Sequence, residues 1–171
     1  MNYYYGGTCD IAVIGAGPCG LSCAAELTKA GYQVTVFEKE ASAGGMLRYG
    51  LPDYAGHKAA LEEEVDNLKA CGVQFVFGTE IKDTAELAVA GFEQVFAAVG
   101  TCGSRVEKYA GMDVLDFLRC VNCADGVKVA DRVAVIGGGY AAVDAARCAI
   151  RLGAKQVTLL HTGTFSKRSA E

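Results

Sequence analysis

The sequence lacks an excess of positive charge, and it lacks a long apolar run. Its 171 residues hold 16 Lys and Arg against 20 Asp and Glu, which gives a formal net charge of −4. This balance excludes a nucleic-acid partner, because phosphate binding needs a basic surface. No apolar run is long enough to span a bilayer, and the N-terminal residues have neither the basic start nor the apolar core of a secretory signal. We therefore expect a cytoplasmic protein without a membrane partner.

Histidines are also few, with 2 in the chain, whereas cysteines number 8 and glycines 22. In the absence of a secretory signal, the cysteines are expected to be reduced thiols. No metal site is expected, because no second Cys-x-x-Cys and no pair of histidines completes the four ligands of zinc. His57 and His161 are expected to be polar loop or surface residues rather than catalysts. Apolar residues make up 51% of the chain, which is enough for the core of one or two domains.

The glycines form the same pattern twice. The first copy, residues 15–20, reads GAGPCG after a short apolar run, and a helical stretch follows it as far as Gly31. The second copy, residues 137–142, reads GGGYAA and is followed in the same way as far as Gly153. Each copy is typical of a strand–turn–helix unit whose glycines let the backbone approach a pyrophosphate at a helix N-terminus. Two such units in one chain indicate two dinucleotides, as hydride transfer between them requires.

The remaining periodicity predicts an α/β fold. Strands are expected at 9–14, 33–37, 73–77, 94–99, 133–136 and 157–160, and helices at 20–30, 58–71 and 114–121, besides the helix after the second glycine copy. This alternation predicts two Rossmann-like dinucleotide-binding units with parallel sheets, the second incomplete. We place an FAD-binding domain that lacks its closing C-terminal strand at 1–102. A linker with a short helix follows at 103–130, and the start of an NAD(P)-binding domain lies at 131–171.

The end of the second strand carries the acidic residue that the first unit needs. Glu38 is placed to accept hydrogen bonds from a ribose diol. The alternative is that Glu38 only ends the strand with a solvated carboxylate. A glycine-rich loop follows it, and this loop carries the most specific pattern of the chain.

That loop reads FEKEASAGGMLRYGLP over residues 37–52, and further motifs follow at 96–101 (FAAVGT), 116–119 (DFLR), 144–147 (DAAR) and 151–154 (RLGA). Together they resemble the small (beta) subunit of NADPH-dependent glutamate synthase and the flavin/NADPH portion of dihydropyrimidine dehydrogenase. The resemblance covers nearly the whole chain. It implies an oxidoreductase in which NAD(P)H reduces FAD by hydride transfer, and in which electrons pass on to an iron–sulfur centre or a larger catalytic subunit.

The same resemblance implies the cofactor contacts. Those expected for FAD are Gly15, Ala16, Gly17, Pro18, Gly20, Glu38, Lys39, Gly45, Met46, Arg48, Ile81 and Gly100, and those for NADP (or NAD) are Gly137, Gly139, Tyr140, Ala141, Lys167 and Arg168. One position departs from the family, because Ala55 stands where an arginine reaches the flavin. No catalytic acid or base is assigned, since the protein's task in hydride transfer is to position the two rings.

The second unit differs from the first at the end of its second strand. His161 falls where the first unit has Glu38. Without a carboxylate to bind a 2′-hydroxyl, this pattern favours NADP over NAD. The family's basic pair after this strand is replaced by Thr-Gly at 162–163, so Lys167 and Arg168 are the first bases available for a 2′-phosphate. Their alternative role is a solvated basic tail.

Cys120 and Cys123 leave a rival interpretation open. Their spacing from the second glycine copy resembles that of the redox disulphide in thioredoxin reductases, which would make the chain a thiol–disulphide reductase. Their flanking residues instead fit the glutamate-synthase pattern, in which these cysteines are incidental. A third alternative is a non-catalytic nucleotide-binding module. Because two strands and one helix cannot bury a parallel sheet, we expect a fragment of a larger enzyme, with homo-oligomerisation through the open sheet edge as a further expectation.

Overall fold

The computed structural model describes residues 9–101, 111–123 and 127–162. The chain divides into two compact units, Met1–Leu47 with His57–Cys102, and Arg48–Gly56 with Gly103–Glu171. The short segment Arg48–Gly56 therefore lies within the sequence of the first unit but packs with the second. Among the described residues, no helix has the length and apolar character needed to cross a membrane.

Strands and helices alternate along the chain, as the sequence predicts. In order they are β1 (Asp10–Ile14), α1 (Pro18–Lys29), β2 (Gln33–Glu38), α2 (Met46–Tyr49), the 3-10 turn η1 (Asp53–Ala55), α3 (Lys58–Ala70), β3 (Gln74–Phe77), α4 (Ala85–Val89), β4 (Gln94–Ala97), α5 (Val114–Cys123), β5 (Arg132–Ile136), α6 (Tyr140–Arg151) and β6 (Gln156–Leu160). Among the described residues, each pair of neighbouring strands is parallel, so the α/β fold class is confirmed.

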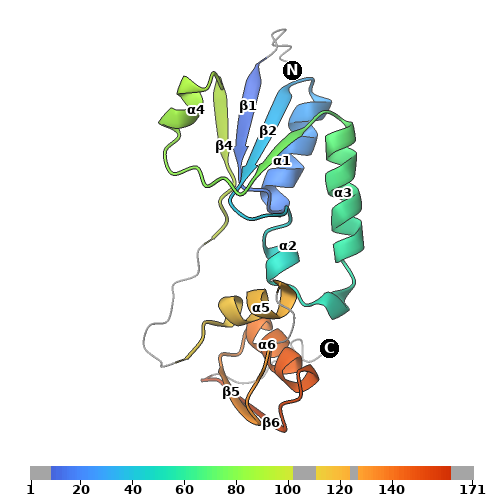
Figure 1. Ribbon diagram of the computed structural model, residues 1–171, viewed down its shortest axis with the longest axis vertical. Helices are drawn as coiled ribbons and strands as arrows, with labels where there is room; N and C mark the ends of the chain where they lie inside the picture. The colour runs from blue at the N-terminus through green and yellow to red at the C-terminus, as the bar shows by residue number, and fades with distance from the viewer. Residues whose placement is uncertain (1–8, 102–110, 124–126, 163–171) are drawn as a thin grey trace. The chain divides into compact units, whose positions relative to one another are not determined.

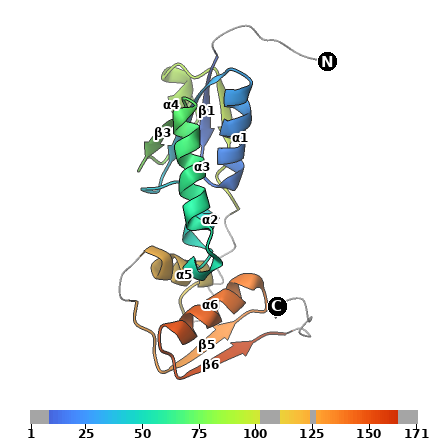
Figure 2. The ribbon, with the colours of Figure 1, turned by 90° about the vertical axis from the view of Figure 1, so that its right-hand side faces the viewer.

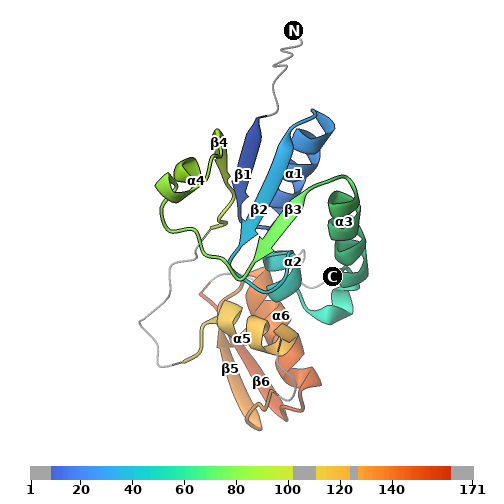
Figure 3. The same ribbon diagram turned by 45° about the horizontal axis from the view of Figure 1, so that its top comes forward.

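The first unit is a four-stranded sheet in the order β3-β2-β1-β4, and Figures 1 and 3 show its strands side by side. Helices α1 and α3 lie on one face of this sheet (Figure 2). Leu61, Val65 and Leu68 of α3 are buried there at the helical spacing that the sequence shows, against a core that includes Val13 and Val36. This apolar layer holds β1 and α1, and with them the first glycine turn.

The second face of the same sheet has a smaller core. Ala12 and Ile14 of β1 pack there with Leu87 of α4. The ring of Phe37 meets the ring of Phe92 edge-on, with centroids 5.5 Å apart. The sequence pattern does not predict α4, because a helix of 5 residues is too short to display a period.

Besides the segment Arg48–Gly56, the second unit contains the parallel pair β5 and β6 with helices α5 and α6 (Figure 2). Helix α5 packs on α6 through Leu118, Ala145 and Cys148, all of which are buried. On β5 and β6, half-buried residues alternate with exposed ones, and Ile136 and Leu160 are 55% and 50% exposed. One face of this sheet is therefore open in the part of the chain that the structure describes.

The two glycine turns have the same local geometry. The Gly15 N–H donates to the Phe37 carbonyl at 2.7 Å, and the Gly137 N–H donates to the Leu160 carbonyl at 2.8 Å. Each bond joins the residue after one strand to the carboxyl end of the neighbouring strand. The duplication seen in the sequence is therefore also a duplication of structure.

Candidate dinucleotide-binding sites

The first and third glycines of the first motif are required by close packing. Gly15 has φ +100°, and a Cβ built on it would lie 2.4 Å from the carbonyl oxygen of Ala98. A Cβ on Gly20 would lie 1.9 Å from the carbonyl oxygen of Gly15. No side chain fits either position, so these two glycines let α1 begin directly against the sheet.

The middle glycines, Gly17 and Gly139, are different, because the chain's own packing does not require them. They have φ −77° and −83°, values that any residue adopts. A Cβ on Gly17 would meet only the Cα of Gly45, at 3.9 Å, and a Cβ on Gly139 would meet nothing within 4 Å. Each is the N-cap of a 12-residue helix, where free N–H groups and the helix dipole favour an anion. Both positions therefore fit the pyrophosphate of a dinucleotide.

Glu38 is not the solvated strand end that was one alternative. The residue is only 6% exposed. The N–H of Ala16 donates to its Oε2 at 2.7 Å, and the N–H of Glu40 donates to its Oε1 at 2.9 Å. Through these two hydrogen bonds the carboxylate stabilises the glycine turn and the start of the loop after β2. The sequence does not reveal this role. Each oxygen still has a lone pair for a further donor.

The other residues expected to contact FAD fall into two groups. Pro18 begins α1 beside Gly17, and Gly44, next to Gly45, donates its N–H to the Ala16 carbonyl at 2.7 Å, so the loop after β2 lies against the first motif. Of the remaining ones, Lys39 and Gly100 are exposed, Met46 is 51% exposed, Ile81 packs into the smaller core, and Arg48 belongs to the second unit.

The second motif tolerates alanine at its third position. Ala142 is buried, and a Cβ on Gly137 would lie 3.3 Å from the Cβ of Ala142. Tyr140, in the first turn of α6, is 77% exposed, whereas Ala141 packs against the core that α5 and α6 share. The tyrosine ring therefore stands in solvent next to the helix N-terminus.

His161 directly follows β6, and Glu38 is the last residue of β2, so both residues stand at the carboxyl end of the second strand of their unit. A Cβ on Gly138 would lie 3.2 Å from the Cβ of His161, so the imidazole is beside the second glycine turn. Lys167 and Arg168 lie outside the described residues.

Cys120 and Cys123 lie in the last turn of α5, and both are free thiols. Within the described ranges, no group of three or more His, Cys, Asp or Glu side chains is placed to hold a metal ion.

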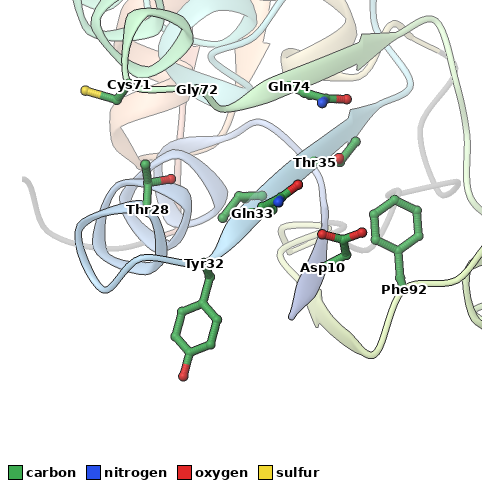
Figure 4. Close-up of a pocket in the computed structure, with 10 residues that line it drawn as sticks. Asp10, Thr28, Tyr32, Gln33, Thr35, Cys71, Gly72, Gln74 and Phe92 are labelled. Atoms are coloured by element: carbon green, nitrogen blue, oxygen red, sulfur yellow. The ribbon is translucent and has the colours of Figure 1, made fainter. Parts of the chain in front are cut away.

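A hollow at the opposite edge of the first sheet is a separate feature (Figure 4). It lies where β1, β2 and β3 begin, and it is lined by Asp10, Thr28, Tyr32, Gln33, Val34, Thr35, Cys71, Gly72, Gln74 and Phe92. Parallel α/β sheets bind their ligands at the carboxyl ends of the strands, which is where the glycine turn and Glu38 lie. The hollow is therefore not the candidate cofactor site.

The sequence and the fold of the chain are similar to those of known proteins. The profile of the pyridine nucleotide-disulphide oxidoreductase family matches residues 9–170. The beta subunit of the NADP(+)-dependent formate dehydrogenase of Moorella thermoacetica is 38% identical over 162 residues, which cover 88% of this chain and 23% of that protein. Subunit PreT of the NAD-dependent dihydropyrimidine dehydrogenase of Escherichia coli is 35% identical over 168 residues, covering 92% and 41%.

The solved structure of Mycobacterium tuberculosis FprA in complex with NADPH superposes with a TM-score of 0.74 at 21% identity, covering 92% of this chain and 44% of that one. At this identity the likeness concerns the fold. The chain spans between 16% and 41% of the length of the curated relatives that it matches.

Proposed function

Because the chain belongs to the pyridine nucleotide-disulphide oxidoreductase family, we propose that it is the FAD- and NAD(P)H-binding part of an NAD(P)H-dependent oxidoreductase. The named NADP(+)- and NAD-dependent relatives support this proposal. Electrons from NAD(P)H pass through FAD to an iron–sulfur centre or a larger catalytic partner, in an arrangement like that of glutamate synthase. Two of the relatives are subunits of larger enzymes, which supports such a partner.

One observation carries the proposal. Gly17 and Gly139 occupy the same position in two repeated turns, and neither is needed by the packing around it. A ligand that approaches the backbone closely explains both glycines at once. Two equivalent glycine turns, each able to hold a pyrophosphate, indicate two dinucleotides rather than one.

The chain's residues bind and position the cofactors. Gly17 and the N-terminus of α1 hold the pyrophosphate of FAD, and Glu38 accepts hydrogen bonds from its ribose hydroxyls. When bound, FAD supplies a ring that accepts hydride and passes electrons onward. Gly139 and the N-terminus of α6 hold the pyrophosphate of NAD(P)H in the same way.

The second nucleotide is NADPH in this proposal. His161 stands beside the second turn where Glu38 stands beside the first, so no carboxylate repels a 2′-phosphate at that position. Lys167 and Arg168 are the bases that we assign to the 2′-phosphate.

The experiment replaces each middle glycine with alanine in the full chain. Gly17→Ala should weaken FAD binding by about 5- to 150-fold in a fluorescence titration, since overpacking a tight contact costs ~1–3 kcal/mol. Gly139→Ala should weaken NADPH binding in the same range and leave FAD binding unchanged. Each variant should lose at most ~1 kcal/mol of stability, because alanine is a poorer N-cap than glycine.

Gly111→Ala is the matched control. A Cβ at Gly111 also meets nothing within 4 Å, but this glycine lies outside both motifs. It should change neither affinity. Unaltered FAD and NADPH binding in Gly17→Ala and Gly139→Ala would overturn the proposal.

A further inference from the structure

Residues Arg48–Gly56, which we call the strap, leave the first unit after Leu47 and return to it at His57. The two ends lie together, because Nε2 of His57 donates to the carbonyl of Leu47. A short segment with adjacent ends is an Ω-loop, a class of loop that is often functional. The contacts that Tyr49 and Tyr54 make with α5 and α6 all lie inside the second unit, to which the strap belongs.

Tyr49 joins the strap to α5. The side-chain amide of Asn122 donates to the Tyr49 carbonyl at 3.0 Å. The guanidinium of Arg119 lies over the Tyr49 ring, 4.9 Å from its centroid. These partners are 70 or more residues distant in sequence, so local structure does not explain the contacts.

Tyr54 joins the strap to α6. Its hydroxyl donates to Oδ1 of Asp144 at 2.7 Å. The guanidinium of Arg151 lies 4.0 Å from the centroid of the same ring. The tyrosine is therefore held at its edge by a carboxylate and on its face by a cation, and both groups come from the helix that begins at the second glycine turn.

The chain just before the strap packs against the first glycine turn. The N–H of Gly44 donates to the Ala16 carbonyl at 2.7 Å, and Gly45 lies so close to Gly17 that a Cβ on Gly45 would be 2.9 Å from the Gly17 Cα. Four residues separate Gly44 from Tyr49. Only this short stretch of chain therefore separates the first turn from the strap, and Tyr54 of the strap contacts α6.

We propose that Tyr54 is a positioning residue through which the strap couples dinucleotide binding at the first glycine turn to helix α6, so that FAD and NADPH bind cooperatively. This rests on the proposed function of the two turns. Because such coupling is reciprocal, each nucleotide raises the affinity for the other by the same factor. Tyr54 acts through Asp144 and Arg151 and contacts neither nucleotide in this proposal.

The test is calorimetric titration of NADPH into the full chain, with and without saturating FAD. Site coupling is commonly between about 5- and 150-fold, and we expect the low end because the strap contacts are partly exposed. FAD should therefore raise NADPH affinity about fivefold in the wild type. In Tyr54→Phe the factor should fall to within about twofold, while the affinity for FAD alone stays unchanged.

Two further variants separate positioning from folding. Asp144→Asn keeps an oxygen that accepts the Tyr54 hydroxyl and should retain part of the coupling, whereas Asp144→Ala should lose it. Tyr32→Phe removes a phenol hydroxyl of the first unit, at a residue that is not in the strap, and should keep the wild-type factor. A general loss of stability would lower the NADPH affinity both with and without FAD, and it would leave the ratio of these two NADPH affinities unchanged.

Hydrogen exchange gives a readout that does not need NADPH. Added FAD should slow amide exchange in α6 of the wild type and leave α6 of Tyr54→Phe unaffected. If the wild type binds both nucleotides without mutual effect, or if Tyr54→Phe retains the coupling, the strap proposal is overturned and the proposed function stands. If the wild type binds no FAD, the proposed function fails and the coupling fails with it.

Discussion

Replacement of Glu38 by glutamine tests the part of the first site that the structure defines most closely. Glu38 is 6% exposed, and its carboxylate accepts one N–H from Ala16 and one from Glu40, at 2.7 and 2.9 Å. A glutamine has one accepting oxygen, and its NH2 group only donates. Whichever way the amide is oriented, one backbone N–H therefore faces another donor. Glu38→Gln should lower the free energy of unfolding by ~1.5–3 kcal/mol, the usual value of a hydrogen bond to a charged group.

The same substitution should weaken FAD binding. In the proposed site, Glu38 accepts ribose hydroxyls with the lone pairs that the backbone leaves free. Loss of one such charge-assisted bond costs ~1.5–3 kcal/mol, which corresponds to an affinity loss of about 10- to 150-fold. Chemical denaturation measures the first effect, and a flavin fluorescence titration measures the second.

Glu26→Gln is the matched control. Glu26 lies on α1, its side chain is 73% exposed, and it pairs with Lys29 at the surface. Exposed pairs contribute little, so this variant should change stability by less than about 1 kcal/mol and should not change FAD affinity. An unaltered unfolding free energy in Glu38→Gln would refute the stabilising role, and an unaltered FAD affinity would refute the ribose contact.

Three further predictions concern the second unit and its neighbourhood. Burial, and next the hydrogen bond to Asp144, raise the pKa of Tyr54 to about 12, so the stability linked to its protonated phenol is present below about pH 10 and is lost as the pH rises towards about 12. An ultraviolet difference titration of wild type against Tyr54→Phe should show this late ionisation, and a normal one would contradict it. Replacement of Cys120 and Cys123 by serine should leave flavin reduction by NADPH unchanged, whereas loss of a two-electron equivalent in a dithionite titration would show a redox pair. Replacement of Lys167 and Arg168 by alanine should cost one to two decades of NADPH affinity and leave NADH affinity unchanged, and calorimetry that finds the preference intact would show only a solvated tail.

Features that repeat at short range are predictable from the sequence. The apolar spacing of Leu61, Val65 and Leu68 predicts α3, and the doubled glycine pattern predicts both strand–turn–helix units. These signals are local, since a helix period or a turn requirement is visible within a few residues. Short elements such as α4 lack enough residues to show any period.

The features that the sequence does not predict depend on contacts between residues that are distant in the chain. Nothing in the sequence indicates that Glu38 accepts the N–H of Ala16, because backbone donors look alike in every residue. Tyr54 and Asp144 are 90 residues apart, so no spacing rule connects them. The strap residues as far as Pro52 belong to the glycine-rich loop that the sequence predicts to bind the cofactor, but nothing in the sequence indicates that the strap packs with the second unit.

Anaerobic titration of the FAD-loaded full chain with NADPH tests the central claim most directly. If the two glycine turns bind the two dinucleotides for hydride transfer, the absorption band of the oxidised flavin should bleach in stoichiometric proportion to the NADPH added. Gly139→Ala should require much more NADPH for the same bleaching, because the Cβ of the new alanine would occupy the place of the NADPH pyrophosphate. A flavin that binds to the wild type but stays oxidised in excess NADPH and NADH would contradict the account.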